Sequence, residues 1–531
     1  MGTNNKSIGK LLEHIDNSEL VLPEIQRDFI WDKKSVLMLL DSLYRRLPIG
    51  YMLVWKAKKA VAQKNFKRVV KKRIGQSIDG FYGYLLDGQQ RLTAIQLVRD
   101  SADEYPLMFS LRPIDAKDPD SGRFSYRARW NSNAWHIPVS DIISKQLSPI
   151  NIVDNLRSEA DFDYNRDANN VIADVTKLQN ILDYSVGLIE FEDDNYHKAT
   201  ELFIRFNSTG KKLKSSDLVA AELALTVPNL VSNSITKVSS SFSSRYNFNF
   251  TKPFLIQCLA AIHTHKIDFK KSTEVWTSYS EKQIHNSWKK TEKGLSRAIE
   301  FITGTVKWDS DTWLPSINSL IPLIYMLSND KFTHDDRMLA RKWLLQASVY
   351  AAFSGSVYSE LDRIIRGIKN EPNISKLISL TKRSTGKILP EHFETSRKSG
   401  PAIALFISLL RNRNAKNWIN RTPLDGSVMG HNAELQIHHF FSRALLSKHG
   451  YDSEAINTFA NYTIISKDTN LDISDMEPIQ YIETYGIRKQ DLILQCIPQD
   501  KELWKVKNYK YFLGERRKLL ARTCNTFLDS K

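Results

Sequence analysis

Hydrophobic and polar residues are patterned as β-strands near both ends of the chain. Near the C-terminal end, Leu435, Ile437 and Phe440 are interspersed with polar residues, which predicts a half-buried strand. The segment 460–466 (ANYTIIS) predicts a second strand or turn, after which Asn470 is expected to open a short helix. Two strands and a helix in succession are therefore expected here.

Near the N-terminal end, a Tyr/Leu-rich segment leads through a turn into a helix. The string YGYLLDGQQRLTAIQLV predicts a strand that ends at Asp87, a turn at Gly88 and a helix beginning near Arg91. Apolar residues on one side give that helix a buried face: Leu92, Ile95, Leu97 and Val98.

The rest of the pattern predicts three domains in an α+β protein. Apolar residues at spacings of three and four predict a helical middle domain over residues 226–385. The polar segment 382–401, rich in Gly, Pro and Ser, is the expected boundary to a C-terminal domain over residues 386–531. Residues 1–225 form the expected N-terminal domain. A chain of 531 residues is too long for one ordinary domain and suits this division.

Composition indicates a globular protein of the cytoplasm. Hydrophobic residues make up 42% of the chain, yet no apolar stretch approaches the roughly 20 residues that cross a bilayer. The start of the chain lacks the apolar centre of a secretory signal. Cys258, Cys496 and Cys524 are widely spaced, which favours reduced core thiols.

Charge points to a polyanionic partner. The formal net charge is +16, and nine Lys and Arg residues fall between Lys56 and Arg73 with no acid among them. Such a cluster attracts nucleic acid, although a solvated hairpin without a ligand is the alternative. The candidate DNA-binding residues are Lys58, Lys59, Lys67, Arg68, Lys71, Lys72 and Arg73.

Candidate catalytic chemistry lies in the C-terminal strand. His438 and His439 are followed by Asn461, 22 residues after His439, and by Asn470 nine residues later. A neutral imidazole can accept a proton at cellular pH, and another can hold a cation. Neighbouring strand residues point to opposite faces, so only a twist, a bulge or a strand end lets both imidazoles serve one centre.

The order His-His, Asn, Asn resembles the ββα-metal finger of HNH nucleases. The resemblance implies that His438 and Asn470 hold a divalent cation, that His439 is the general base and that Asn461 orients it. A site with so few protein ligands suits Mg²⁺ or Mn²⁺ better than a closed zinc site. The chain departs from the usual pattern at Ser442, where relatives carry Pro.

The turn at Asp87 to Arg91 has the properties of an anion-binding corner. A Gly-containing turn into a helix presents backbone N–H groups at the positive end of the helix dipole, and an arginine can grip a phosphate. An ordinary capped turn is the alternative, with Asp87 holding Arg91.

Four blocks in the N-terminal half resemble GmrSD-type, modification-dependent restriction endonucleases. They are LPEIQRDFIW (22–31), RLPIGYMLVW (46–55), the Asp-Gly-Gln-Gln-Arg string and FIRFNSTGKKLKSSDLVAAEL (203–223). The resemblance implies a fold similar to ParB and sulfiredoxin-like domains and a nucleotide pocket, with a nucleoside triphosphate as its ligand. Its residues would be Gln26, Arg27, Asp87, Gly88, Gln89, Gln90, Arg91, Asn207, Ser208, Thr209 and Gly210.

Together the resemblances imply a type IV-like DNA endonuclease or nickase of anti-phage defence, with modified double-stranded phage DNA as substrate and nucleotide as the gate. A nucleotide-gated DNA-binding regulator that does not cut is the alternative. A membrane is not expected as a partner, and the sequence leaves self-association open.

Overall fold

The computed structural model of the chain divides into two compact units. One comprises residues 1–233 and 273–278, and the other comprises residues 234–272 and 279–531. The structure describes residues 2–23, 29–56, 63–64, 82–100, 107–114, 117–126, 135–144, 147–193, 198–199, 202, 219–220, 223–224, 226–227, 229–267, 276, 278–329, 331–354, 357–396, 400–424 and 435–530. The three domains expected from the sequence stay a prediction.

The N-terminal unit is built on a mixed six-stranded sheet with the order β1-β9-β3-β5-β2-β4. Its strands are β1 (Gly2–Ser7), β2 (Leu20–Pro23), β3 (Met52–Lys56), β4 (Gln63–Lys64), β5 (Gly83–Asp87) and β9 (Ser185–Glu192). Strands β2 and β5 run parallel, with Leu20 opposite Gly83, whereas β3 and β5 run antiparallel. The chain therefore leaves β2 and β5 at the same edge of the sheet.

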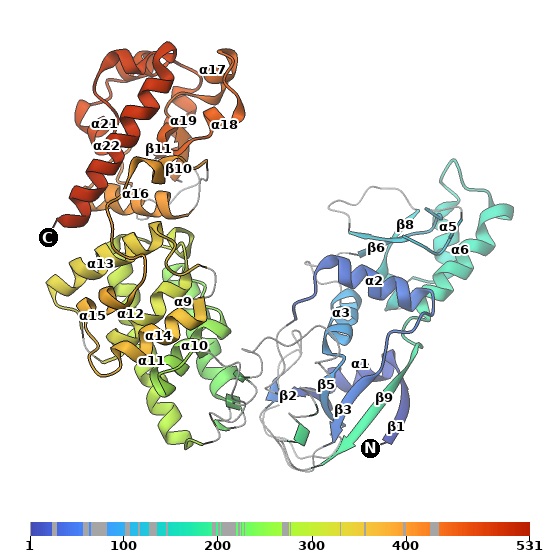
Figure 1. The fold of residues 1–531 in the computed structure, drawn as a ribbon. Helices are drawn as coiled ribbons and strands as arrows, with labels where there is room; N and C mark the ends of the chain where they lie inside the picture. Colours follow the sequence, from blue (N-terminus) through green and yellow to red (C-terminus); the bar gives the residue numbers. More distant parts are fainter. Residues whose placement is uncertain are drawn as a thin grey trace. The chain divides into compact units, whose positions relative to one another are not determined.

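Helices of the described residues accompany this sheet, and Figure 1 labels most of them. They are α1 (Ile8–Asp16), α2 (Lys33–Tyr44), α3 (Gln89–Arg99), α4 (Val139–Ile143), α5 (Pro149–Leu156) and α6 (Tyr164–Gln179). A smaller three-stranded sheet has the order β7-β6-β8, from β6 (Leu107–Ser110), β7 (Phe124–Tyr126) and β8 (His136–Pro138). One hydrophobic core joins residues of the helices and of both sheets.

Helix α1 illustrates how the sequence fixes these elements. Ser7 caps it, because its side chain accepts a hydrogen bond from the backbone N–H of Lys10. The buried residues lie at the spacing of one helix face: Ile8, Leu11, Leu12 and Ile15. Each of them is at most 1% exposed, so the helix is held by its packing on the sheet.

The second unit begins with a helical part. Its helices are α9 (Thr236–Tyr246), α10 (Lys252–Thr264), α11 (Glu281–Phe301), α12 (Leu320–Asn329), α13 (His334–Val349), α14 (Val357–Ile368), α15 (Ile374–Leu380) and α16 (Pro401–Asn412). Capping boxes fix the starts of α11, at Ser280 and Gln283, and of α13, at Thr333 and Asp336. The helical middle of the chain is thus confirmed.

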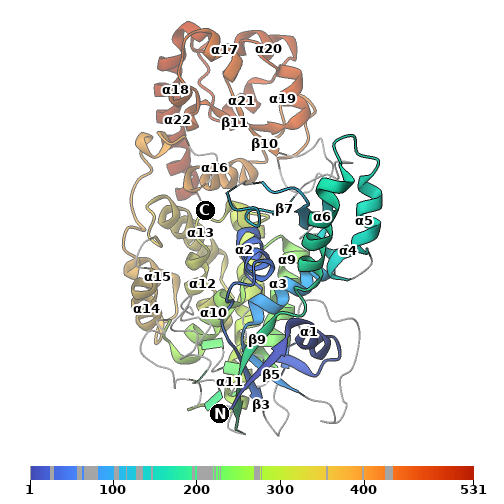
Figure 2. The same ribbon diagram turned by 90° about the vertical axis from the view of Figure 1, so that its right-hand side faces the viewer.

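The end of the chain surrounds a two-stranded antiparallel sheet, β10 (Leu435–His439) and β11 (Tyr462–Ser466). Figure 2 shows the surrounding helices in orange and red. They are α17 (Arg443–Lys448), α18 (Ser453–Ile456), α19 (Lys467–Ile473), α20 (Pro478–Thr484), α21 (Lys489–Leu494) and α22 (Tyr509–Asp529). Strand β11 leads directly into α19, so both predicted strands are present and a helix follows them.

Two details correct the predicted helix starts. Helix α3 begins at Gln89, two residues before Arg91, because the positive φ of Gly88 ends the strand there. Helix α19 begins at Lys467 because the Ser466 side chain accepts a hydrogen bond from the Thr469 N–H. Asn470 therefore lies inside the helix and does not open it.

The chain's cysteines and helices agree with the composition. Cys258, Cys496 and Cys524 are free and buried. Burial raises the pKa of the Cys258 thiol above its ordinary range, which keeps it protonated. Across the described ranges, none of the helices combines the length and the apolar character that crossing a bilayer requires.

Candidate functional site

The two histidines lie at the end of strand β10, which pairs antiparallel with β11. In its register His438 lies opposite Thr463, and His439, the last residue of β10, lies opposite Tyr462. Directly paired residues share a face and neighbours alternate, so the strand geometry directs the two imidazoles toward different faces. Their ring centroids are nevertheless 6.5 Å apart.

His439 is held from two sides. The residue is only 9% exposed, and its Nε2 lies 3.0 Å from Oδ1 of Asn457. The ring of Tyr462 stands edge-on to the imidazole with 5.2 Å between centroids. The imidazole is therefore placed by an amide and an aromatic ring together. Asn457 was not among the residues predicted from the sequence.

Asn461 supports the backbone that follows the histidines. Its fully buried side chain accepts a hydrogen bond from the N–H of Phe441 at 2.9 Å and donates to the Phe441 carbonyl at 3.1 Å. It also donates to the carbonyl of Ile456 at 3.1 Å. The amide thus joins the strand end to the end of α18.

Two further buried side chains hold the same region. The guanidinium of Arg516, on α22, donates to the carbonyls of Ala460 at 2.9 Å and Tyr462 at 2.6 Å, on either side of Asn461. It also donates to the carbonyl of Gln495 at 3.2 Å. Burial lowers the pKa of Arg516 to about 10, so it stays charged at neutral pH. The Tyr481 hydroxyl donates to the carbonyl of Phe440 at 2.9 Å.

Helix α19 carries Asn470 and packs against both strands. Ile473 of this helix and Ile465 of β11 belong to one buried cluster. Ile465 shares its strand face with Thr463, the partner of His438. Residues of the helix and of this strand face thus belong to the same buried core.

Ser442 has a local structural role in place of the usual proline. Its side chain, 6% exposed, accepts a hydrogen bond from the N–H of Leu445 at 3.1 Å and so caps α17. A proline's fixed φ favours the start of a helix, and a serine cap favours the same start by a hydrogen bond. The Ser442 cap therefore starts α17, the helix after the histidines, without a proline.

The Asp87–Arg91 turn lies in the N-terminal unit, where β5 meets α3. Gly88 has φ +100°, and a Cβ there would lie 2.7 Å from Cγ of Met52. Arg91 donates to the carbonyls of Ile49 at 2.6 Å and Tyr51 at 2.8 Å and to Asp87 at 2.7 Å. Burial lowers the pKa of Arg91, while Asp87 opposes that shift. The arginine therefore holds the corner together, and Asp87 is paired with it.

The glutamines of this turn lie at the start of α3. Gln89 is 5% exposed, and Oε1 of Gln90 accepts a hydrogen bond from the N–H of Ile30 at 2.9 Å. Strand β2 ends at Pro23, at the same sheet edge as Asp87. The chain on both sides of residues 24–28 is thus fixed close to this corner.

Several predicted residues lie outside the described part of the chain. They are Gln26, Arg27, Asn207, Ser208, Thr209 and Gly210 of the expected nucleotide pocket, and Lys58, Lys59, Lys67, Arg68, Lys71, Lys72 and Arg73 of the expected DNA contact. Their assignments stay predictions.

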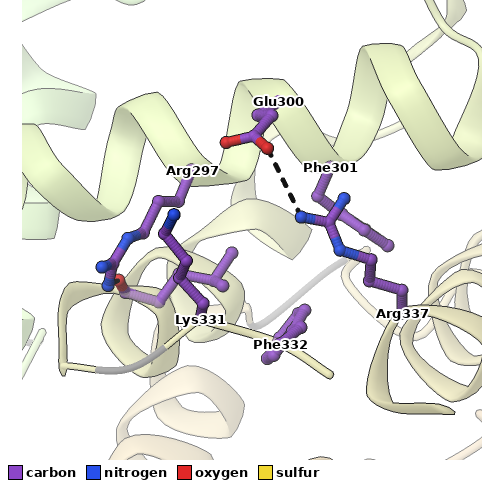
Figure 3. Close-up of a pocket in the computed structure, with 7 residues that line it drawn as sticks. Arg297, Glu300, Phe301, Lys331, Phe332 and Arg337 are labelled. Carbon is purple, nitrogen blue, oxygen red and sulfur yellow. Dashed lines mark hydrogen bonds and ion pairs between the residues drawn. The ribbon is translucent and has the colours of Figure 1, made fainter. Parts of the chain in front are cut away.

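Charged side chains also gather beside α11 in the second unit. Figure 3 shows a small pocket beside α11, in which Arg337 pairs with Glu300 at 3.4 Å. Arg297, at the same pocket, donates to the carbonyl of Leu327 at 2.9 Å near the end of α12. Among the described residues, no three His, Cys, Asp or Glu side chains gather as they would in a closed metal centre.

Comparisons with known proteins define the N-terminal part. Residues 8–224 match the family model described as GmrSD restriction endonuclease, N-terminal domain. This range contains all four sequence blocks, so the resemblance to GmrSD-type restriction endonucleases is confirmed for the N-terminal domain. The whole chain is also similar to an uncharacterised protein of Methanocaldococcus jannaschii. The two are 22% identical over 582 residues, which cover 99% of this chain and 94% of the relative.

Proposed function

We propose that this protein is a modification-dependent DNA endonuclease or nickase of anti-phage defence, and that β10, β11 and α19 form its HNH-type cutting site. One observation carries the proposal. His438 and His439 end strand β10, and its antiparallel partner β11 leads directly into α19, the helix that bears Asn470. The Asn461 side chain bonds to the backbone just after the histidines, at Phe441. The GmrSD match over the N-terminal domain supports restriction of DNA as the context.

His439 is the proposed general base. A neutral imidazole has an unperturbed pKa near 6.5 and can accept a proton at cellular pH. The water oxygen bonds to phosphorus while its proton passes to His439. The bond from phosphorus to the 3′ oxygen breaks, and that oxygen keeps the electron pair and takes a proton from solvent. The products are a 5′ phosphate and a 3′ hydroxyl.

His438 and Asn470 fit an open cation site. An imidazole nitrogen and an amide oxygen are two neutral ligands, which leave most positions to water and phosphate, as Mg²⁺ and Mn²⁺ prefer. When bound, such an ion would offset the charge that develops on the phosphate and the leaving oxygen.

The N-terminal domain is the proposed sensor. The start of α3 presents backbone N–H groups beside Gln89 and Gln90, where a nucleotide phosphate would gain from the helix dipole. Arg91 fixes the shape of this corner. Nucleotide binding there would gate recognition of modified double-stranded DNA, with the basic cluster of residues 56–73 contacting the backbone.

A DNA-binding regulator without cleavage is the second candidate. It is favoured by one observation, since no carboxylate stands next to His438 in the sequence. A carboxylate is the usual partner of Mg²⁺ in proteins.

Plasmid nicking by the purified full chain separates the two candidates. Modified and unmodified plasmids are incubated with Mg²⁺ or Mn²⁺, with and without nucleoside triphosphate, and with EDTA. Cation-dependent nicking that EDTA stops supports the endonuclease. Nicking that survives EDTA favours the regulator. The regulator is also favoured if no plasmid is nicked while DNA still binds. Restriction of phages that differ only in DNA modification then identifies the substrate.

A further inference from the structure

Asn457 lies within hydrogen-bond distance of the His439 ring, with its Oδ1 3.0 Å from Nε2. It follows α18 directly, and its backbone N–H bonds to the carbonyl of Ser453 at 3.0 Å. Asn457 is not one of the motif residues, so sequence spacing alone gives it no role. Its contact with the proposed base raises the question of which imidazole nitrogen carries the proton.

The orientation of the Asn457 amide follows from its other contacts. Its Nδ2 donates to the carbonyl of Ser453 at 2.8 Å and to the Ser453 hydroxyl at 3.0 Å. A backbone carbonyl can only accept, so the NH₂ group must face Ser453. The Oδ1 atom therefore faces His439 Nε2, at 3.0 Å.

This orientation fixes the imidazole tautomer. An amide oxygen has no hydrogen to give, so the contact requires a hydrogen on Nε2 of His439. A neutral imidazole carries one such hydrogen, and the lone pair then resides on Nδ1. We infer that Asn457 is a positioning residue that holds His439 as the Nε2–H tautomer, so that Nδ1 is the atom that takes the proton from water.

The turn that carries Asn457 is itself anchored. The carbonyl of Ala455 accepts from the Tyr509 hydroxyl at 2.8 Å, and the carbonyl of Ile456 accepts from Asn461. Asn461 thus connects the strand end after His439 with the turn before Asn457. Such supporting contacts keep a base in register with its substrate, as they do for metal ligands.

The inference rests on the proposed nuclease function for its consequence, but the tautomer can be measured without any activity. Proteins labelled with ¹⁵N at histidine are compared by NMR at mildly alkaline pH, with His439→Gln used to assign the signal among the 12 histidines. The wild type should show His439 with a hydrogen on Nε2, and Asn457→Ala should show a mixture of tautomers. A wild-type His439 with its hydrogen on Nδ1 would overturn the inference.

Cleavage kinetics then test the consequence. Asn457→Ala should lower kcat about tenfold to a hundredfold, with the KM for DNA unchanged. Asn457→Asp keeps an oxygen acceptor and should restore kcat to within a few-fold of wild type. The matched control is Asn373→Ala, which removes the side-chain cap of α15 and leaves His439 untouched.

The two hypotheses fail in different ways. If the wild type cuts DNA and Asn457→Ala keeps its full kcat, or if Asn457→Asp loses as much as Asn457→Ala, the role of Asn457 is wrong and the nuclease function stands. If the wild type cuts no plasmid under any condition, the proposed function is wrong, and the tautomer measurement still decides what Asn457 does.

Discussion

Arg91 and Asp87, four residues apart, form an ion pair of 2.7 Å that joins the end of β5 to the start of α3. The same guanidinium holds the carbonyls of Ile49 and Tyr51, so it binds the segment before β3 to the start of the helix. A side chain used in this way is part of the frame of the proposed nucleotide pocket, and its loss should be seen first in stability.

Replacing Arg91 by Ala should lower the free energy of unfolding of the N-terminal unit by about 2 kcal/mol, because two carbonyls and a partly buried carboxylate lose a charged donor. Urea denaturation followed by tryptophan fluorescence measures it. Arg99→Ala is the control, since the carboxylates that Arg99 contacts are 44% and 30% exposed, and it should cost less than about 1 kcal/mol. Unchanged stability in Arg91→Ala with loss of nucleotide binding would instead make Arg91 a direct phosphate ligand.

Gly88→Ala should destabilise the same unit for two reasons. Gly88 has φ +100°, and the added Cβ would meet Met52 at 2.7 Å. Gly122 has φ +69° with nothing within 4 Å of its added Cβ, so Gly122→Ala measures the backbone strain alone. We expect about 1 kcal/mol for Gly122→Ala and at least about 1 kcal/mol more for Gly88→Ala. Equal losses would show that Met52 moves aside without cost.

Arg516→Met should destabilise the region around strand β11, because three buried carbonyls lose their hydrogen-bond donor. The expected loss is about 3 kcal/mol in the free energy of unfolding. Arg517→Ala is the adjacent control. Arg517 meets Glu394 at 3.3 Å, where Glu394 is 55% exposed, so its loss should cost less than about 0.5 kcal/mol. Thermal unfolding compares the two variants. A loss of stability in Arg516→Met no larger than in Arg517→Ala would contradict the structural role of Arg516.

The apolar pattern predicted the parts of the site that depend on local preferences. Strands β10 and β11 were predicted because apolar residues recur along them, and the turn at Gly88 because glycine tolerates positive φ. The start of α19 was misplaced because the cap at Ser466 is also the last residue of a strand. Two periodicities meet at that residue, and the sequence alone does not separate them.

Contacts closed by tertiary packing were not predictable in this way. Asn457 reaches His439 only because the turn of α18 folds back beside the strand end. Arg516 lies more than 50 residues after the carbonyls of Ala460 and Tyr462 that it holds. The motif residues predict where the proposed site lies, whereas the side chains that hold this region in shape come from tertiary packing that no sequence spacing encodes.

We propose His439 as the base of a cation-dependent DNA-cutting site. The most direct measurement is the single-turnover rate of plasmid nicking by wild type and by His439→Ala in Mg²⁺, with DNA binding and thermal unfolding measured on the same samples. A general base contributes about 10² to 10⁴ in rate, so we predict a loss of that size with folding and DNA binding retained. Nicking by His439→Ala at the wild-type rate would show that His439 is not the base.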